Sequence, residues 1–230
     1  MSKLVNDKEW RAARLELLDE EKAFQRARDA LAVKRRTLPW RRVESDYVFD
    51  TEDGAKSLPD LFGDATQLLV YHFMYHPNWD AGCKSCSFWA DSYDGSVLHL
   101  KARDVALIAV SRAPLDTLLK YRDRMQWSFP WVSSAGNTFN YDFGVSFTPE
   151  QLDSGEVEYN YRIAGGRPEE LPGISVLVRE GDEVFHTYST YSRGLDPFNA
   201  TYQLLDIVPK GRDEDSLSFT MEWLRRHDEY

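Results

Sequence analysis

Residues 67–91, QLLVYHFMYHPNWDAGCKSCSFWAD, place an apolar run, a loop and the start of a helix in direct succession. The run 67-QLLVYHFM-74 has the length of a strand and the composition of a central strand that is covered on both faces. The helix is expected from about Cys83 to His99. The chain's two cysteines, Cys83 and Cys86, stand at its start with two residues between them. We therefore expect the two thiols to meet at a helix N-terminus.

The segments that follow predict crossover connections on a parallel or mixed sheet. A second buried strand is expected at 104-DVALIAVS-111, and a helix and a short strand come after it, which is the spacing of such connections. Gly181-Asp182 lies between two strand patterns and is a strong hairpin signal. Further expected elements are a strand at 46–50, a small helix between turns at 51–64, helix 114–126, strands 129–134, 157–162, 174–180 and 183–190, and helix 196–208.

A long amphipathic helix is expected at residues 6–37, ended by Pro39. Its largest apolar residues recur every seven positions, at Trp10, Leu17, Phe24 and Leu31. We favour packing of this stripe on the protein's own domain; the alternative is packing on a second copy in a homodimer. The expected organisation is a helical extension at 1–42, an α/β domain at 43–210 and a charged, partly helical tail at 211–230.

Composition and charge argue against several partners. A formal charge of −10 disfavours nucleic acid and anionic membranes, whose binding is driven by clustered Lys and Arg. The basic run 34-KRRTLPWRR-42 is expected to be the solvated end of the first helix. No apolar run approaches ~18 residues and no signal-peptide core is present, so we expect a cytoplasmic protein. In that reducing compartment a cysteine pair is more often catalytic or metal-binding than a structural disulfide.

The position of the pair assigns a role to each thiol. A thiolate at a helix N-terminus faces unpaired N–H groups and the positive end of the dipole, which lowers its pKa from about 8.5 toward ~7. Lys84 adds a positive charge beside Cys83, the predicted reactive thiol. Cys86, one turn inside the helix, is the predicted resolving thiol, which attacks a mixed disulfide or sulfenic acid at Cys83. The pattern predicts a thiol–disulfide oxidoreductase or thiol peroxidase that needs no cofactor.

Four residues outside the pair are candidates for a surrounding pocket. Arg112 follows the second central strand, where open α/β sheets place ligands, although a salt bridge to a helix Asp is the simpler interpretation. His186 and Tyr188 are expected on one face of their strand, where they could form a polar wall or simply suit a half-exposed strand. His76, in the loop before Cys83, is the best candidate for tuning the thiol pKa.

Metal binding and protein docking remain as alternatives. Two thiolates and one or two imidazoles can hold zinc or copper, and His72, His76 and His186 could all lie near the pair. His72 is also expected as a hydrogen-bonded core residue of its strand. The sequence has no second cysteine pair to complete a zinc site, so we predict no metal. A non-catalytic protein-interaction module is the third interpretation.

The element order and the cysteine motif resemble the thioredoxin fold. Cys83-Lys84-Ser85-Cys86 stands where that family has W-C-G-P-C, and Pro172 lies near the place of its cis-proline. Over nearly its whole length the chain resembles a bacterial thioredoxin-like family of unknown function, through the stretches 71-YHFMYHPNWDAGCKSCSFWAD-91, 109-AVSRAPL-115, 129-FPWVSS-134, 139-FNYDFGVSF-147, 186-HTYSTYSRGLD-196 and 225-RRHDEY-230. The resemblance implies a thioredoxin-like α/β fold, a mixed sheet flanked by helices, but brings no known activity.

The chain also departs from its better-known relatives. Segment 55–73 is similar to the entry of peroxiredoxins, but their P-x-x-x-T-x-x-C signature is missing, since Pro77 is six residues before Cys83 and no Thr stands at the required place. Compared with thioredoxins, the loop 75–82 is longer and Lys84-Ser85 replaces Gly-Pro. A large loop beside the thiols favours a small substrate over a protein disulfide. The expected partners are a small thiol, disulfide or peroxide substrate, or a reductant protein.

Overall fold

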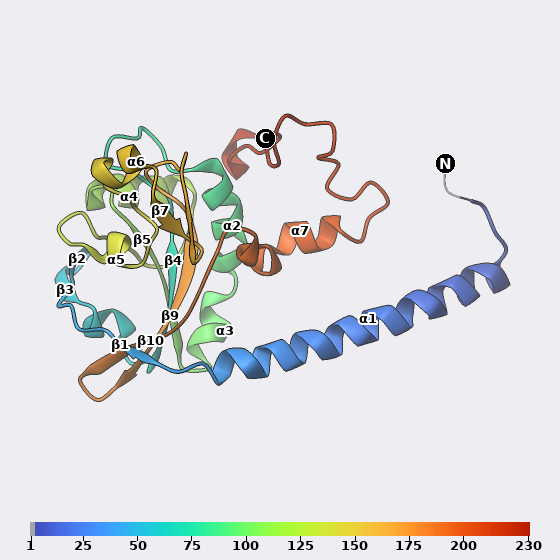
Figure 1. Ribbon diagram of the computed structural model, residues 1–230, viewed down its shortest axis with the longest axis horizontal. Coiled ribbons are helices and arrows are strands. Elements are labelled where there is room, and N and C mark those ends of the chain that lie inside the picture. Colours follow the sequence, from blue (N-terminus) through green and yellow to red (C-terminus); the bar gives the residue numbers. More distant parts are fainter. Residues whose placement is uncertain (1–2) are drawn as a thin grey trace. The chain divides into compact units, whose positions relative to one another are not determined.

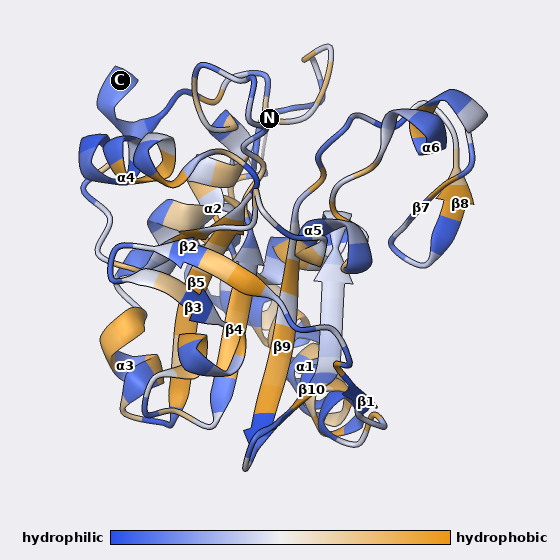
Figure 2. Ribbon diagram, turned by 90° about the vertical axis from the view of Figure 1, so that its left-hand side faces the viewer, coloured by the Kyte–Doolittle hydropathy of each residue, from blue (hydrophilic) through white to orange (hydrophobic). Residues whose placement is uncertain are grey.

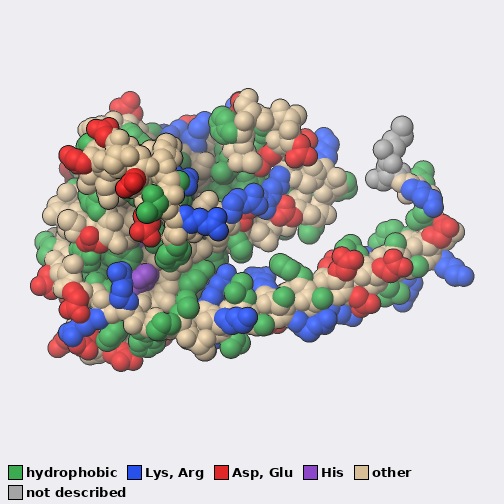
Figure 3. Space-filling view, in the orientation of Figure 1, with side chains coloured by type: hydrophobic (Ala, Val, Ile, Leu, Met, Phe, Trp, Pro, Cys, Tyr) green, Lys and Arg blue, Asp and Glu red, His purple; other side chains and the backbone are tan. Residues whose placement is uncertain are grey.

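The computed structural model describes residues 3–230 and contains two compact units, one ending at Pro39 and one comprising Trp40–Tyr230. The first is built on helix α1 (Asp7–Arg36), which confirms the expected long helix. A capping box fixes its start: the Asn6 side chain accepts the N–H of Glu9, and the Glu9 carboxylate accepts the N–H of Asn6. None of its residues is buried, and charged side chains of both signs line it (Figure 3).

An eight-stranded mixed sheet forms the second unit, in the order β1-β10-β9-β4-β5-β6-β2-β3. Strand β4 pairs in parallel with β5 and antiparallel with β9, and these three strands are mostly hydrophobic (Figure 2). The strands of this sheet are β1 (Arg41–Arg42), β2 (Val48–Thr51), β3 (Gly54–Ser57), β4 (Gln67–His72), β5 (Val105–Ser111), β6 (Trp131–Ser133), β9 (Gly173–Glu180) and β10 (Glu183–Tyr191).

The central part of this sheet has the thioredoxin topology. Helix α2 (Lys84–Asp94) connects β4 to β5, helix α4 (Leu115–Arg124) connects β5 to β6, and β9 and β10 form a hairpin (Figure 1). In the sheet these strands lie in the order β10-β9-β4-β5, so β4 has a strand on either side. The hairpin turns at Gly181, whose φ of +60° suits a residue without a Cβ. The predicted thioredoxin-like α/β fold is confirmed.

Alternation along the central strands creates a separate core on each face of the sheet. Tyr71 and Phe73 point to the face covered by α2 and α4, where they meet Trp89 and Leu118. The alternate residues of β4 point to the opposite face, where Leu68, Val70, Phe49 and Phe139 pack together. Phe139 belongs to the short helix α5 (Phe139–Asp142). We call these the α2 face and the α5 face.

Several elements differ from the sequence expectations. The helix expected from Cys83 to His99 is divided at Gly95-Ser96 into α2 and α3 (Val97–Lys101), and the helix expected at 196–208 is a 3-10 segment, η2 (Ser192–Phe198), followed by α7 (Ala200–Leu205). Pro197 lies within η2 and has no N–H to continue an α-helix.

The segment between β6 and β9 holds more structure than the one strand expected there. It forms α5, then α6 (Pro149–Ser154), and then a separate two-stranded sheet of β7 (Val157–Tyr159) and β8 (Arg162–Ala164). The remaining 3-10 segments are η1 (Pro59–Phe62) and η3 (His227–Glu229). Within residues 3–230, no helix is both long and apolar enough to cross a membrane.

Candidate active site at the start of helix α2

Cys83 caps helix α2, directly beyond the end of strand β4. Its N–H donates to the carbonyl of Met74 (3.2 Å), and its own carbonyl accepts the N–H of Ser87 (3.0 Å). The side chain of Cys83 is partly exposed, whereas Cys86 is 2% exposed and its sulfur accepts the N–H of Met74 at 3.4 Å. Both cysteines are free thiols. The geometry therefore presents one sulfur to solvent and holds the other beneath it.

The environment moves the pKa values of the two thiols in opposite directions. A hydrogen bond from the Cys86 thiol, assisted by the backbone N–H groups of Cys86 and Ser85, lowers the pKa of Cys83 from 9.0 to about 6, against the opposing effect of burial. Burial, followed by the proximity of Cys83, raises the pKa of Cys86 well above its ordinary value. Both shifts favour a Cys83 thiolate that accepts a hydrogen bond from a Cys86 thiol.

Aromatic side chains of β4 and α2 form the floor beneath Cys86. The Tyr71 hydroxyl donates to the Cys86 carbonyl at 3.0 Å, and its ring packs edge-on against Tyr93 with centroids 5.0 Å apart. Gly82, the residue before Cys83, packs against the ring of Phe73, because a Cβ at this position would lie 2.8 Å from that ring. The residue before the thiolate therefore has no room for a side chain.

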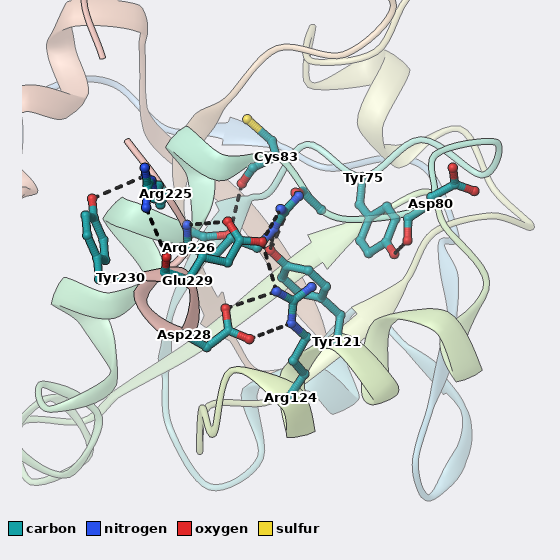
Figure 4. A network of polar contacts seen from close by, with 12 residues as sticks. Tyr75, Asp80, Cys83, Tyr121, Arg124, Arg225, Arg226, Asp228, Glu229 and Tyr230 are labelled. Atoms are coloured by element: carbon teal, nitrogen blue, oxygen red, sulfur yellow. Dashed lines mark hydrogen bonds and ion pairs between the residues drawn. The ribbon is translucent and has the colours of Figure 1, made fainter. Parts of the chain in front are cut away.

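A polar network from α4 and the C-terminus reaches the backbone on both sides of Cys83 (Figure 4). Arg226 donates to the Gly82 carbonyl (Nη2, 2.9 Å) and to the Tyr121 hydroxyl (Nε, 2.7 Å). That hydroxyl lies 2.9 Å from the Ser87 Oγ, which donates to the Cys83 carbonyl at 2.9 Å. Sequence reasoning missed Arg226, Tyr121 and Ser87; the only signal was 225-RRHDEY-230 among the stretches that carry the family resemblance.

Arg112 follows β5, as expected, but it is bound by an ion pair. Its Nε donates to the carboxylate of Glu170 at 2.6 Å, and its guanidinium lies over the ring of Tyr141 and bonds the hydroxyl of that residue. Glu170 is 1% exposed and also accepts the Ser146 hydroxyl at 2.6 Å, while burial raises its pKa. Arg112 therefore forms the salt bridge that was the simpler interpretation of the sequence, but its partner is Glu170 in a loop and not an Asp in a helix.

His186 and His72 belong to a polar chain on the α5 face, away from α2. His186 contacts the Ser189 hydroxyl (2.7 Å), Ser189 contacts Ser175 (2.7 Å), and Ser175 contacts His72 (2.8 Å). The His186 ring also packs against Phe143, a member of the α5-face core. Burial lowers the pKa of both imidazoles, that of His72 to about 3. The sheet therefore lies between these two histidines and the cysteines.

The prediction that His186 and Tyr188 share one face of their strand is wrong. A bulge in β10 shifts the register, so His186 pairs with Leu177 whereas Tyr188 pairs with Val176. Directly paired residues point to the same face, and the extra residue of a bulge therefore turns Tyr188 toward the α2 face. Tyr188 remains a candidate on the face that carries the thiols.

The other predicted site residues lie around the same end of the sheet. His76 is in the loop after β4, where its Nε2 lies 3.5 Å from the carboxylate of Glu169. Lys84 is the exposed first residue of α2. Pro172 immediately precedes β9, and its carbonyl accepts the Tyr159 hydroxyl at 2.7 Å. Every peptide bond between described residues is trans, so Pro172 occupies the expected place without a cis bond.

The donor set for the metal alternative does not assemble. Among residues 3–230, no group of three or more His, Cys, Asp or Glu side chains is arranged to hold a metal ion. His72 and His186 are on the α5 face, and His76 is turned to Glu169.

Sheet order, crossover helices and a cysteine pair at the start of α2 together define a thioredoxin-fold protein with a Cys-x-x-Cys motif. The chain belongs to the family described as "Bacterial protein of unknown function (DUF899)", whose model matches residues 1–230. A search of curated proteins finds no match.

Solved structures similar to this one include peroxiredoxins. The peroxidoxin BcpB from Mycobacterium tuberculosis has 13% identity and a TM-score of 0.48, with 73% of this chain and 97% of that chain covered. Peroxiredoxin Q from Xanthomonas campestris has 13% identity and a TM-score of 0.49, with 74% and 97% covered. Thioredoxin peroxidase I from Plasmodium yoelii has 15% identity and a TM-score of 0.43, with 74% and 88% covered.

Proposed function

We propose that this protein is a thiol–disulfide oxidoreductase or thiol peroxidase in which Cys83 is the nucleophile and Cys86 the resolving thiol. The observation that carries the proposal is the arrangement of two free thiols at the start of α2, with Cys83 partly exposed at the cap and Cys86 2% exposed beneath it. These surroundings lower the pKa of Cys83 and raise that of Cys86. A thiolate at neutral pH is the form that attacks disulfides and peroxides. A cysteine kept only for packing needs neither exposure nor a lowered pKa.

The chemistry follows from the arrangement of the pair. With a disulfide substrate, the Cys83 thiolate displaces one thiolate and forms a mixed disulfide; Cys86 then loses its proton and displaces the second, leaving a Cys83–Cys86 disulfide. With a hydroperoxide, the thiolate attacks the terminal oxygen, releases the alcohol after protonation, and becomes a sulfenic acid. Cys86 condenses with it and water leaves. A small dithiol or reductant protein returns two electrons in either case.

We also propose that the protein is cytoplasmic, where such a cysteine pair is kept reduced. The surroundings of Cys83 support a small substrate. Exposed Lys84 adjoins Cys83 and is suited to attract an anionic thiol or peroxide. Tyr188 and Pro172 are the candidates to line the approach from the β9–β10 side, and His76 from the preceding loop. The Arg112–Glu170 ion pair joins the end of β5 to the loop ahead of Pro172.

We also propose a homodimer through α1, with two copies antiparallel. The stripe of Trp10, Leu17, Phe24 and Leu31 is exposed. Residues 7–21 hold six acidic and three basic side chains, and residues 22–36 hold six basic and one acidic. An antiparallel pair sets each acidic half against a basic half. Light scattering should give twice the chain mass for the wild type and the monomer mass for Phe24→Glu; a monomeric wild type contradicts the dimer.

The proposed activity is tested by turnover with a small disulfide and a hydroperoxide, each with dithiothreitol as reductant. We expect Cys83→Ser to abolish turnover of the substrate that the wild type accepts, and Cys86→Ser to reduce it at the resolving step. A wild type without turnover of either substrate, or a fully active Cys83→Ser variant, contradicts the proposal.

A further inference from the structure

The last six residues of the chain form a segment that is attached to both α2 and α4. We call this segment, Arg225–Tyr230, the C-terminal clasp. Arg124 of α4 binds the carboxylates of Asp228 (2.7 Å) and Glu229 (3.0 Å), and Asp91 of α2 accepts from the His227 ring at 2.7 Å. These contacts hold the clasp across the two helices that cover one face of the sheet, and Figure 4 shows those of Arg124.

Arg226 is the clasp residue that reaches the cysteine turn. Its side chain is 16% exposed, and Glu229 of the same segment holds its Nη1 at 2.9 Å. The other donors bind the Gly82 carbonyl and the Tyr121 hydroxyl, and from that hydroxyl the contacts continue through Ser87 to the Cys83 carbonyl. The carbonyl groups of Gly82 and Cys83 are therefore linked through one hydrogen-bonded network, in which Arg226 binds the first directly and the second through Tyr121 and Ser87.

Building on the proposed function, we propose that Arg226 is a positioning residue for the Cys83 nucleophile, and that it acts by fixing the backbone on both sides of that residue. Figure 4 shows the Cys83 sulfur pointing out of the network, while the Arg226 guanidinium binds the Gly82 carbonyl, the Tyr121 hydroxyl and the Glu229 carboxylate. Arg226 thus acts through geometry: it keeps Cys83 at the cap of α2, where the N–H groups of Ser85 and Cys86 stabilise the thiolate.

A guanidinium suits this position better than an ammonium group. Its planar fork donates to Gly82, Tyr121 and Glu229 in three directions at once, which the compact ammonium of a lysine on a flexible stem does not reproduce. Ionisable and charged groups approach the turn from every packed element: Tyr71 of β4, Tyr75 and Asp80 of the following loop, Lys84, Cys86 and Tyr93 of α2, Tyr121 and Arg124 of α4, Tyr159 of β7, and Arg226 and Glu229 of the clasp. Within residues 3–230, Arg226 is the side chain from outside α2 and α4 that donates to the Gly82 carbonyl.

The test measures the pH dependence of Cys83 alkylation by iodoacetamide, with the modified peptide identified by mass spectrometry. We expect Arg226→Gln to raise the midpoint of Cys83 labelling by about half a pH unit or more, since the thiolate loses part of its N–H support. Arg226→Lys should recover less than half of this shift. The matched control is Arg225→Gln, which removes the same charge from an exposed neighbour that contacts only the clasp itself, and its midpoint should equal that of the wild type.

A second variant covers the case in which Arg226→Gln does not fold. Arg124→Gln loosens the clasp at its other anchor and keeps the hydrogen bonds of Arg226 to Gly82 and Tyr121, although it also removes the Arg124 guanidinium from the Tyr121 ring. It should shift the midpoint in the same direction by a smaller amount. Thermal unfolding of each variant separates this effect from loss of stability. A midpoint that is unchanged in Arg226→Gln, or shifted equally in Arg225→Gln, overturns the inference. A wild-type Cys83 that is not the faster-labelled thiol overturns the proposed function instead.

Discussion

The backbone N–H of Met74, just beyond the end of β4, points at the sulfur of Cys86 from 3.4 Å. The Met74 carbonyl accepts the N–H of Cys83, so one residue holds both members of the pair. Because Cys86 is fixed below and Cys83 lies partly exposed above it, attack from outside reaches Cys83 first. The buried thiol is then already in place for the second step.

This relationship predicts which variant accumulates a covalent intermediate. Cys86→Ser removes the resolving thiol but leaves the exposed nucleophile, so incubation with a small aromatic disulfide should yield a stable mixed disulfide at Cys83. Cys83→Ser should yield little adduct, because Cys86 is buried and its pKa is raised. Intact-mass spectrometry reads both outcomes, and a stable adduct on Cys86 in the Cys83→Ser variant would reverse the assigned roles.

Gly82→Ala should destabilise the protein by about 1–3 kcal/mol, since the new methyl group meets the rings of Phe73 and Tyr121. For a chain of this size that corresponds to a melting temperature lower by roughly 2–4 °C per kcal/mol. Gly95→Ala is the matched control at the other end of α2: nothing lies within 4 Å of its Cβ, and its φ of −65° suits alanine. Equal melting temperatures for the two variants would show that Gly82 is not spatially required.

Arg112→Met should cost about 3–5 kcal/mol of unfolding free energy, because it leaves the Glu170 carboxylate buried without its partner. The double variant Arg112→Met/Glu170→Met should recover much of that loss. Chemical denaturation gives the unfolding free energy of the wild type, the single variant and the double variant. Alkylation of Cys83 should change little in the double variant if the pair is structural; a labelling rate reduced tenfold in a stable double variant would instead give Arg112 the direct role predicted from the sequence.

The purified protein should carry well below one equivalent of zinc or copper, and a chelator should leave its melting temperature unchanged. A cysteine-bound structural zinc contributes to folding directly, so its removal shifts the melting temperature. Elemental analysis of the wild type and of Cys83→Ser gives the comparison. Stoichiometric metal that disappears in Cys83→Ser would favour the metal-binding alternative.

The fold could be predicted because its signals are local. The apolar runs of β4 and β5, the hairpin glycine at 181 and the cysteines at the start of α2 all act within a few residues of chain. The bulge in β10 could not be predicted, because nothing in the alternation of 183–190 shows where an extra residue enters the strand. Placing His186 and Tyr188 on one face failed for that reason.

The candidate site was predictable only where it is contiguous in sequence. Cys83, Cys86 and Lys84 are neighbours along the chain, and their positions follow from the helix start. The contacts of Arg226 with Gly82 and of Arg112 with Glu170 join residues that are far apart in the chain, and no periodicity encodes such pairs. The ending 225-RRHDEY-230 belongs to the expected charged tail, and its partners on α2 and α4 lie more than 100 residues earlier in the chain.

The pH dependence of the unfolding free energy is a poor measure of the Cys83 thiolate, because the pKa shifts of Cys83 and Cys86 change that free energy in opposite directions. The folded-state pKa of Cys83 is lowered, so its contribution is present above the unfolded value of about 8.5 and is lost as pH falls through about 6. The pKa of Cys86 is raised, so its contribution is present below the unfolded value and is lost as pH rises. At alkaline pH the contributions of Cys83 and Cys86 to the unfolding free energy partly cancel. The labelling rate of each sulfur, by contrast, can be measured separately.

The most direct test of the account is therefore the rate of iodoacetamide labelling at each cysteine of the reduced wild type from pH 4.5 to pH 9.5. Labelling of Cys83 should rise with a midpoint near 6 and be flat from neutral pH upward, because its thiolate is then fully formed. Cys86 should stay unlabelled until the protein is denatured. A Cys83 midpoint at or above the unfolded value of about 8.5, or faster labelling of Cys86 in the folded protein, would contradict the assignment of Cys83 as the nucleophile.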